Sequence, residues 1–370
     1  MSSTAVPPDL PDPEALPEGF RVYDVAVEEG AVRYYGELDA SEEAVVRAAA
    51  PLFRDRGYRV ELTHAMGEHV LVATERSTQV EGVPWVNVGL FVATVFTTLL
   101  AGARWYGLPV ASDPLSMLGA WPFSVAVLGV LAVHELGHYA LSRHHDVEAS
   151  LPYFIPIPNP LGTLGAVIRM NDTIPDRDAL FDIGVAGPLA GLAATVVVTA
   201  VGVSLPPVDL STAGGATLAS RLELGYPLLI QGIAAALGRP LRYADPSLLV
   251  NPVVVGGWVG AFVTFLNLLP VGQLDGAHVT RALVGDATDY VQLAVPGALF
   301  ALAGYLLVFE DGRAATIWLL WGFLALVFTR VGAARPIDRS GVGRRRQAVG
   351  LATLVLGALC FTPVPLVVTP

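Results

Sequence analysis

The chain has 370 residues, of which 53% are hydrophobic and only 15% are charged, a composition too apolar for a soluble protein of this size. Its net charge of -11, with no lysine, would repel phosphate, so we expect no nucleic-acid partner. The single cysteine, Cys360, excludes an intramolecular disulfide and a cysteine-based zinc site.

The first 83 residues are predicted to stay outside the membrane. They hold 16 acidic residues against 7 arginines. Residues 1–18 are acidic and rich in proline, which blocks regular structure, so we expect a disordered lead-in that is not a cleavable signal peptide. Residues 19–83 then form a candidate soluble domain.

The pattern of residues 19–83 predicts a small α+β fold. Two stretches alternate like strands, a helical stretch follows with Asp39 as its expected N-cap, and a hairpin is expected over 58–74. Nothing in this domain resembles a catalytic constellation. We therefore interpret His64 and His69 as surface residues of strands and not as ligands.

The rest of the chain is predicted to cross a membrane repeatedly. Its apolar stretches approach the roughly 20 residues that a crossing needs. They lie near 85–104, 121–142, 180–204, 252–270, 291–309, 315–334 and 348–368. We therefore predict a multi-pass α-helical membrane protein with about seven transmembrane helices and a re-entrant extended segment, and the first crossing is expected to act as the insertion signal.

The arginines set the expected orientation. The loop between the last two predicted spans holds five arginines against one acid, so we place it in the cytoplasm. Counting back through single crossings puts the loops 143–179 and 271–290, and the soluble domain, on the same side. The C-terminus is then extracytoplasmic, in a multi-pass protein of the cell membrane. The apolar segment 226–237 is only about a dozen residues long, so we interpret it as re-entrant or interfacial; a full crossing there would reverse everything after it.

His134, Glu135 and His138 form an HExxH motif within a stretch that holds no other ionisable side chain from Trp121 to Leu141. On a helix, positions i and i+4 share one face, so both imidazoles can reach one metal ion while Glu135 lies beside it. Ionisable groups at membrane depth are costly and are usually functional. The motif therefore indicates a hydrolytic metal site within the bilayer.

A catalytic zinc ion normally has three protein ligands and an open position for water. The histidine pair lies near the predicted cytoplasmic end of its span, so the third ligand should lie at the same end of another. Residues 267–276 (NLLPVGQLDG) end such a span, and Pro270 would break the helix there and turn Asp275 inward. His278, three residues further on, is the rival candidate.

Several small residues are predicted to allow close helix packing, and two further histidines are predicted to lie at the membrane interface. Residues 187–191 (GPLAG), and Gly256 with Gly260, are patterns that allow close helix packing, the first of them against the catalytic helices. His144 and His145 directly follow the span that carries the metal motif, so we expect both at the membrane interface.

Together the two motifs resemble those of the site-2 protease family of intramembrane zinc metalloproteases, HExxH and NxxPxxxLDG. Both are complete here and occur in the expected order. The similarity extends to residues 152–156, 162–166 and 187–191 and covers about residues 85–285. It is most like the branch without a PDZ domain, which includes chloroplast and prokaryotic homologues with a small soluble domain ahead of the membrane core.

The resemblance implies a role for each motif residue. His134, His138 and Asp275 would bind one Zn²⁺, and Glu135 would be the general base. Asn267 would contact the substrate backbone or the developing oxyanion. Residues 151–170 could in addition present a strand edge that holds an unwound substrate extended.

The expected substrate is a membrane protein with a single transmembrane segment, cleaved in the lipid bilayer after an upstream site-1-type protease has trimmed it. Residues 84–285 would form the metalloprotease core and residues 286–370 additional C-terminal transmembrane helices. Two alternatives stay open: a membrane zinc peptidase of another family, or a catalytically inactive metal-binding scaffold. Oligomeric state is not indicated.

Overall fold

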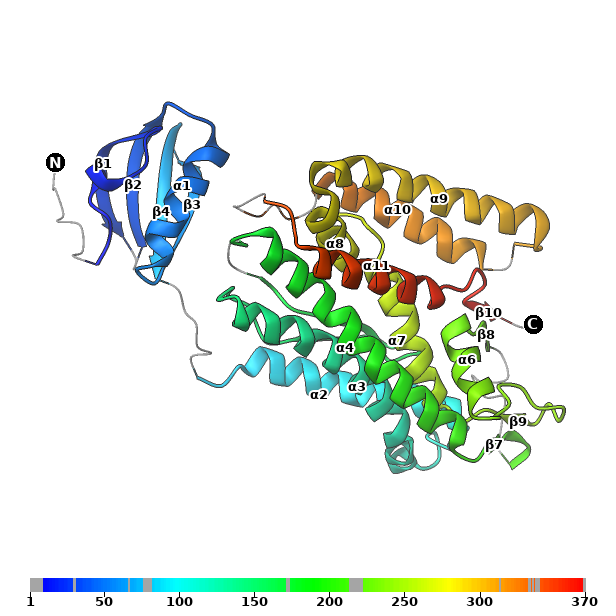
Figure 1. Ribbon diagram of the computed structural model, residues 1–370. Helices are drawn as coiled ribbons and strands as arrows, with labels where there is room; N and C mark the ends of the chain where they lie inside the picture. Colours follow the sequence, from blue (N-terminus) through cyan, green and yellow to red (C-terminus); the bar gives the residue numbers. More distant parts are fainter. Residues whose placement is uncertain are drawn as a thin grey trace. The chain divides into compact units, whose positions relative to one another are not determined.

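A computed structural model describes residues 9–28, 31–65, 67–75, 82–170, 174–212, 222–312, 314–331 and 340–368, together with 334 and 336. The chain divides into two compact units, an N-terminal unit of Met1–Val83 and a helical unit of Pro84–Pro370 (Figure 1).

The N-terminal unit is a four-stranded antiparallel sheet with one helix packed on it (Figure 1). The sheet order is β1-β2-β4-β3, with β1 Phe20–Glu28, β2 Ala31–Leu38, β3 Tyr58–Ala65 and β4 Glu68–Glu75. Helix α1 spans Glu42–Arg54, and Ser41 is its N-cap through a side-chain bond from the Ala44 amide. The predicted cap at Asp39 was therefore wrong by two residues, because the chain enters the helix later than its apolar spacing suggests.

Of residues 1–18, which were predicted to be disordered, the structure describes residues 9–18. Residues 1–8 lie outside the described residues, but residues 9–18 pack against the sheet and include a short 3₁₀ turn at Pro13–Ala15. Leu10 is buried, and the buried Tyr34 hydroxyl donates to the Pro11 carbonyl at 2.9 Å. Burial raises the pKa of Tyr34 to about 12. Disorder therefore does not hold for residues 9–18: apolar contact outweighs their high proline content.

The helical unit consists mainly of long apolar helices. In chain order its helices are α2 Trp85–Tyr106, α3 Trp121–His144, α4 Arg177–Ser204, α6 Leu228–Ala236, α7 Val253–Asn267, α8 Asp275–Val284, α9 Thr288–Phe309, α10 Ala315–Val331 and α11 Arg344–Leu359. Four stretches within the described residues are long and apolar enough to cross a membrane: Trp85–Tyr106, Pro114–His144, Arg177–Ser204 and Asp275–Phe309. The protein is thus a mostly helical membrane protein with a small N-terminal β domain.

The remaining apolar segments are shorter than predicted. Helices α7 and α10 have 15 and 17 residues. The last predicted span, 348–368, is helical only as far as Leu359, and the chain then extends into β10 (Leu366–Val368). Prolines at 363 and 365 cannot continue a helix, which explains the early end. Helix α6, in the segment interpreted as re-entrant or interfacial, has nine residues.

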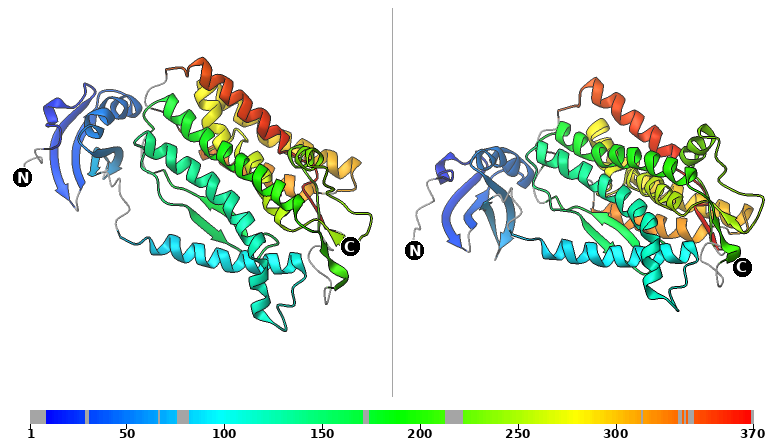
Figure 2. Two further views of the ribbon diagram at one scale, coloured as in Figure 1. Left: turned by 60° about the horizontal axis from the view of Figure 1, so that its bottom comes forward. Right: turned by 90° about the horizontal axis from the view of Figure 1, so that it is seen from below.

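Helices α3, α4 and α7 pack on one another and form the centre of the helical unit. A hairpin of β5 (Tyr153–Pro156) and β6 (Thr163–Val167) lies between α2 and α3, with β5 against α2 and β6 against α3 (Figure 2). Two further short pairs, β7 (Val208–Asp209) with β9 (Leu248–Leu249) and β8 (Leu222–Leu224) with β10, join the loops at the ends of the helices. The hairpin and the break after α7 are the two non-helical features that reach the site described next.

Candidate metal centre

The HExxH motif lies on α3, where helical geometry places its two histidines one turn apart on the same face. His134 and His138 are 2% and 7% exposed, and Glu135 is 6% exposed. A titratable side chain is almost never this buried without a partner. The three side chains therefore need partners from neighbouring elements.

Asp275 comes from a second part of the chain, because α7 ends at Asn267 and a new helix begins at Asp275 itself. A carboxylate in the first turn of a helix is favoured by the exposed N–H groups there. The next residue must be glycine: a methyl group at Gly276 would overlap the Leu268 carbonyl. The Leu-Asp-Gly sequence thus turns the chain tightly beside the end of α7.

The structure brings the three predicted ligands together. The two histidine Nε2 atoms lie 3.2 Å apart, and each lies 3.2 Å from a carboxylate oxygen of Asp275. His138 Nδ1–H donates to the Ile183 carbonyl at 2.8 Å, which leaves its Nε2 with the free lone pair of the neutral ring. Asp275 Oδ2 is buried and lies 3.2 Å from His134 Nε2. These atoms form a buried group that could hold a metal ion.

Glu135 and Asn267 border the same group. Glu135 of α3 and Ile168, the residue that follows β6, line one cavity. Asn267 Nδ2 lies 3.2 Å from His134 Nε2. Both side chains line a cavity of about 170 Å³ together with the two histidines and Asp275. A carboxylate and an amide donor are therefore available beside the three clustered ligand atoms.

His278, the rival third ligand, lies one turn further along α8. It is 3% exposed and lines the same cavity, but its ring does not belong to the group of three donors. Its Nε2 is buried without a hydrogen-bond partner among the described residues. The geometry therefore favours Asp275 as the third donor, and His278 lines the cavity without joining the group of donors.

Small residues of α4 make room for the two histidine rings. A methyl group at Gly187 would overlap His138 Nε2, and one at Gly191 would lie 2.9 Å from His134 Nδ1. A methyl group at Gly256 of α7 would likewise meet Ala126 of α3 at 2.6 Å. The prediction that these glycines serve close helix packing is confirmed, and for Gly187 and Gly191 the neighbours are the metal-site histidines themselves.

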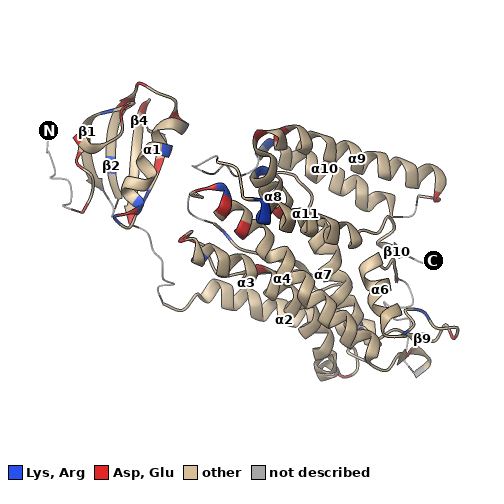
Figure 3. Ribbon diagram, in the orientation of Figure 1, with Lys and Arg blue, Asp and Glu red and all other residues tan. Residues whose placement is uncertain are grey.

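A polar cluster ties the helices together near the start of α4. Arg346 of α11 donates to Asp178 at 2.7 Å and to both oxygens of Asp182 at 2.7 and 2.8 Å. His145, at the end of α3, lies 3.0 Å from Asp182. Charged residues gather at these helix ends, while most of the helix bodies lack them (Figure 3). Since Asp182 precedes Ile183, whose carbonyl receives His138, the cluster holds the backbone that orients this ligand.

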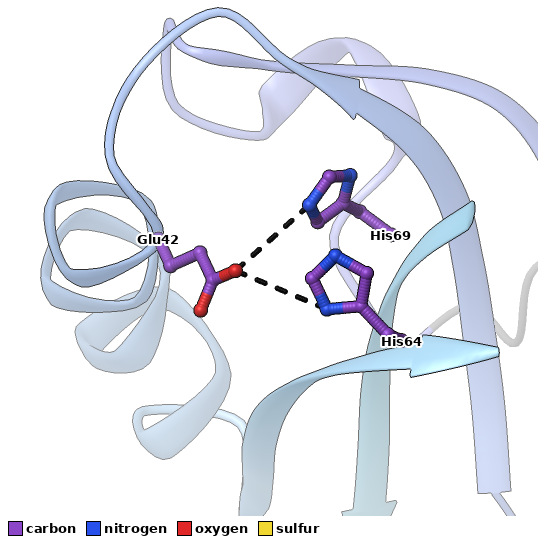
Figure 4. Close-up of side chains that lie close together, drawn as sticks. All are labelled: Glu42, His64 and His69. Carbon is purple, nitrogen blue, oxygen red and sulfur yellow. Dashed lines mark ion pairs between the residues drawn. The ribbon is translucent and has the colours of Figure 1, made fainter. Parts of the chain in front are cut away.

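A second group of two histidines and a carboxylate lies in the N-terminal unit, where sequence reasoning expected only surface residues. His64 Nδ1 and His69 Nε2 each lie 3.9 Å from Glu42 Oε1 (Figure 4). The signal that could have revealed the group is the hairpin register, because the predicted turn between β3 and β4 pairs His64 directly with His69.

The described cavities include a larger one, of about 240 Å³, away from these histidines. It is lined by the loops around β8 and β9 together with Trp105 and Val255. Neither a histidine nor a cysteine lines it. Cavity size therefore does not identify the reactive site, whereas the clustered ligand atoms do.

Comparison with known proteins agrees with the geometry. The model of peptidase family M50 matches residues 122–308, about half of the chain. The probable zinc metalloprotease EGY1, chloroplastic, of Arabidopsis thaliana is 32% identical over 246 residues, which cover 66% of this chain and 43% of that protein. The probable zinc metalloprotease EGY2, chloroplastic, of the same plant is 28% identical over 308 residues, which cover 81% and 53%. The chain thus spans about half the length of the relatives it matches.

Proposed function

Because this chain belongs to peptidase family M50, we propose that it is an intramembrane zinc metalloprotease that hydrolyses peptide bonds in or near the transmembrane segment of membrane proteins. The observation that carries the proposal is the convergence of His134, His138 and Asp275, which come from two helices and meet with their ligand atoms 3.2 Å apart. The relatives named as probable zinc metalloproteases support the same function.

The three residues fit one zinc ion. Ligand atoms about 2.0–2.1 Å from a tetrahedral zinc ion lie about 3.3 Å from one another. Here the two histidine Nε2 atoms are 3.2 Å apart, and each lies 3.2 Å from a different oxygen of Asp275. A cation between the Asp275 carboxylate and the Nε2 atoms of His134 and His138 would stabilise these buried polar atoms. When bound, zinc would polarise the scissile carbonyl and make water nucleophilic near neutral pH.

In this proposal, side chains of the protein transfer the proton and stabilise the developing negative charge. Glu135 takes the proton from the attacking water and passes it to the leaving amine, since it lines the cavity beside the three ligand residues. The Asn267 amide donates to the substrate carbonyl oxygen as negative charge develops there. His278 lines the same cavity without binding the metal.

The hairpin β5–β6 supplies a surface on which the substrate could be held extended. Ala166 and Val167 of β6 and the following Ile168 line the catalytic cavity. A helical substrate has no free carbonyls, so it must unwind before hydrolysis, and pairing with a strand edge would satisfy its backbone. We propose that the substrate adds to β6 beside Glu135.

The proposed topology has seven crossings, by α2, α3, α4, α7, α9, α10 and α11, with the N-terminal unit in the cytoplasm and the C-terminus outside the cell membrane. A nine-residue helix is about 14 Å long and falls well short of the roughly 30 Å hydrocarbon core, which supports α6 as a non-crossing segment. Arg344 and Arg345 are exposed at the start of α11, as a cytoplasmic loop requires. Arg335, Asp338 and Arg339 of this loop lie outside the described residues.

The proposed substrate class is a protein with a single transmembrane segment that a site-1-type protease has already trimmed. The cavity of about 170 Å³ has room only for a short piece of extended chain around the scissile bond and not for a folded domain. A large luminal or extracellular domain would keep the scissile segment from reaching β6, so prior trimming would control access.

The test is Glu135→Gln against the wild type, with cleavage of a single-span reporter and zinc content measured in parallel. We expect retained zinc and lost cleavage, because the carboxylate is the base and not a ligand. Equal cleavage by the two proteins would refute the assigned base. A reporter fused after the C-terminus should be found outside the cell; a cytoplasmic signal would mean that α6 crosses.

A further inference from the structure

Two histidines of the β3–β4 hairpin and one glutamate of α1 meet on the N-terminal unit. His64 and His69 are directly paired across the hairpin, and Glu42 is the first residue of α1 (Figure 4). From this geometry we propose that the three residues form a second metal site, separate from the membrane centre, for a divalent transition-metal ion of the Zn²⁺ type.

The spacing of the donors fits an ion better than it fits hydrogen bonds. The carboxylate oxygen Oε1 of Glu42 lies 3.9 Å from each ring nitrogen, too far for either nitrogen to donate to it. The centroids of the two imidazole rings lie 4.0 Å apart, so both rings are already close enough to bind the same ion. Donors around a tetrahedral ion lie about 3.3 Å apart, so a small rotation of the exposed Glu42 side chain would close the site.

The donor types select the class of ion. Two imidazoles and one carboxylate suit Zn²⁺, Ni²⁺ or Cu²⁺, whereas Ca²⁺ and Mg²⁺ prefer oxygen ligands alone. The side chains of Glu42 and His64 are more than half exposed. Three ligands at the surface leave the other positions to water, so the ion would exchange with the solution.

A bound ion would connect parts of the unit that are distant in the sequence. Glu42 belongs to the first turn of α1, and the histidines flank the turn between β3 and β4. An ion that binds only the folded form raises the free energy of unfolding by RT ln(1 + L/Kd), where L is the free ion concentration, so the stabilisation grows with the logarithm of that concentration. The site would therefore make the stability of the N-terminal unit depend on the free metal concentration.

The test measures zinc bound per chain on the full-length purified protein, dialysed against a fixed free Zn²⁺ concentration. We expect His64→Ala and His69→Ala each to lower the content by one ion relative to the wild type. Loss of an outer-shell partner alone weakens metal binding about 10–100-fold, so loss of a ligand should weaken this site at least about 100-fold. Because the readout is a difference of one ion, it holds whether or not the membrane centre binds zinc.

Matched controls separate the site from nonspecific binding. His144→Ala removes an exposed imidazole elsewhere, and Glu61→Gln removes an exposed carboxylate of β3; both should leave the content unchanged, whereas Glu42→Gln should lower it. A second readout is hydrogen exchange of the α1 and β3 amides that exchange through unfolding of the unit. At a free Zn²⁺ concentration 100 times Kd, exchange should slow about 100-fold in the wild type and not in His64→Ala.

Two results would overturn the proposal. One is unchanged zinc content in both histidine variants. The other is an equal fall in Glu61→Gln and Glu42→Gln, which would indicate general attraction of cations to an acidic surface.

Discussion

Within the part of the chain that the structure describes, two groups of two histidines and one carboxylate differ in how they are built. In the membrane group, formed by His134, His138 and Asp275, the histidines are one helical turn apart on α3 and the carboxylate comes from α8. Each histidine Nε2 lies 3.2 Å from an oxygen of Asp275, and both histidines are buried. In the surface group the histidines face each other across a hairpin, and the distances are 3.9 Å in an exposed setting.

The comparison shows how burial changes the need for a metal ion. Buried donors cannot turn to water, so without a cation they carry the cost of unpaired polar groups. Exposed donors are satisfied by water, so their ion is optional. We therefore expect the membrane group to hold its metal tightly and the surface group to follow the concentration in solution.

The largest effect should come from removing the carboxylate of the membrane group. Asp275→Ala should lose zinc and reduce cleavage at least about 1,000-fold, which corresponds to about 4 kcal/mol of the activation barrier. Zinc content and reporter cleavage check this, with His278→Ala as the control that keeps zinc. Zinc lost from His278→Ala but kept by Asp275→Ala would make His278 the third ligand.

A glycine that touches neither substrate nor metal should have the next largest effect. A methyl group at Gly187 would overlap His138 Nε2 and force the ring away from its partners. Because a displacement of about 1 Å can cost about 100-fold in rate, Gly187→Ala should lose about that much activity together with much of its zinc. Gly232→Ala, where a methyl group would meet open space, is the matched control. Normal zinc content in Gly187→Ala would contradict the described packing.

The membrane group could be predicted because its signals are local and chemically unusual. A turn of helix fixes the relation of His134 to His138, and a charged motif stands out in an apolar stretch. Asp275 required the second motif, since spacing along the chain does not say which helices pack together. The close approach of Gly187 to His138, and the Arg346 cluster, depend on helix packing that no local pattern contains.

The surface group shows the opposite case. Histidines at 64 and 69 are ordinary in exposed strands, and only the hairpin register and the position of α1 bring Glu42 to them. The apolar stretches predicted helices well, but not their ends: the 348–368 stretch stops being helical at Leu359, where prolines follow. Four spans meet the length and composition of a crossing within the described residues, and seven crossings stay a prediction.

A chelator should separate the two groups. The surface ion is held by two exposed side chains and the partly exposed His69. It should leave at a chelator concentration at least about 100-fold lower than the buried ion, because the buried donors become costly unpaired polar groups when their ion leaves and therefore hold it more tightly. Zinc remaining per chain, measured along a chelator titration, should fall in two steps. A single step in the wild type, unchanged by His64→Ala, would contradict the comparison.

The smallest effect should come from the polar cluster behind the membrane group. Arg346→Gln removes hydrogen bonds to Asp178 and Asp182 and should destabilise the helical unit by about 1–3 kcal/mol. Cleavage should fall by less than about tenfold, because the ligands themselves remain. Arg345→Gln, at an exposed neighbouring position, is the control for the thermal unfolding measurement. Equal stability of the two variants would show that the Arg346 cluster does not stabilise the helical unit.

The most direct test of the central claim is the zinc X-ray absorption spectrum of the full chain carrying His64→Ala and His69→Ala, so that only the membrane group contributes. We expect a single zinc environment with two imidazole nitrogens at about 2.0–2.1 Å and carboxylate oxygen at about 2.0–2.2 Å. The same spectrum should persist in Glu135→Gln and vanish in Asp275→Ala. Zinc without imidazole scattering, or zinc unaffected by Asp275→Ala, would contradict the assignment of His134, His138 and Asp275 as the metal centre.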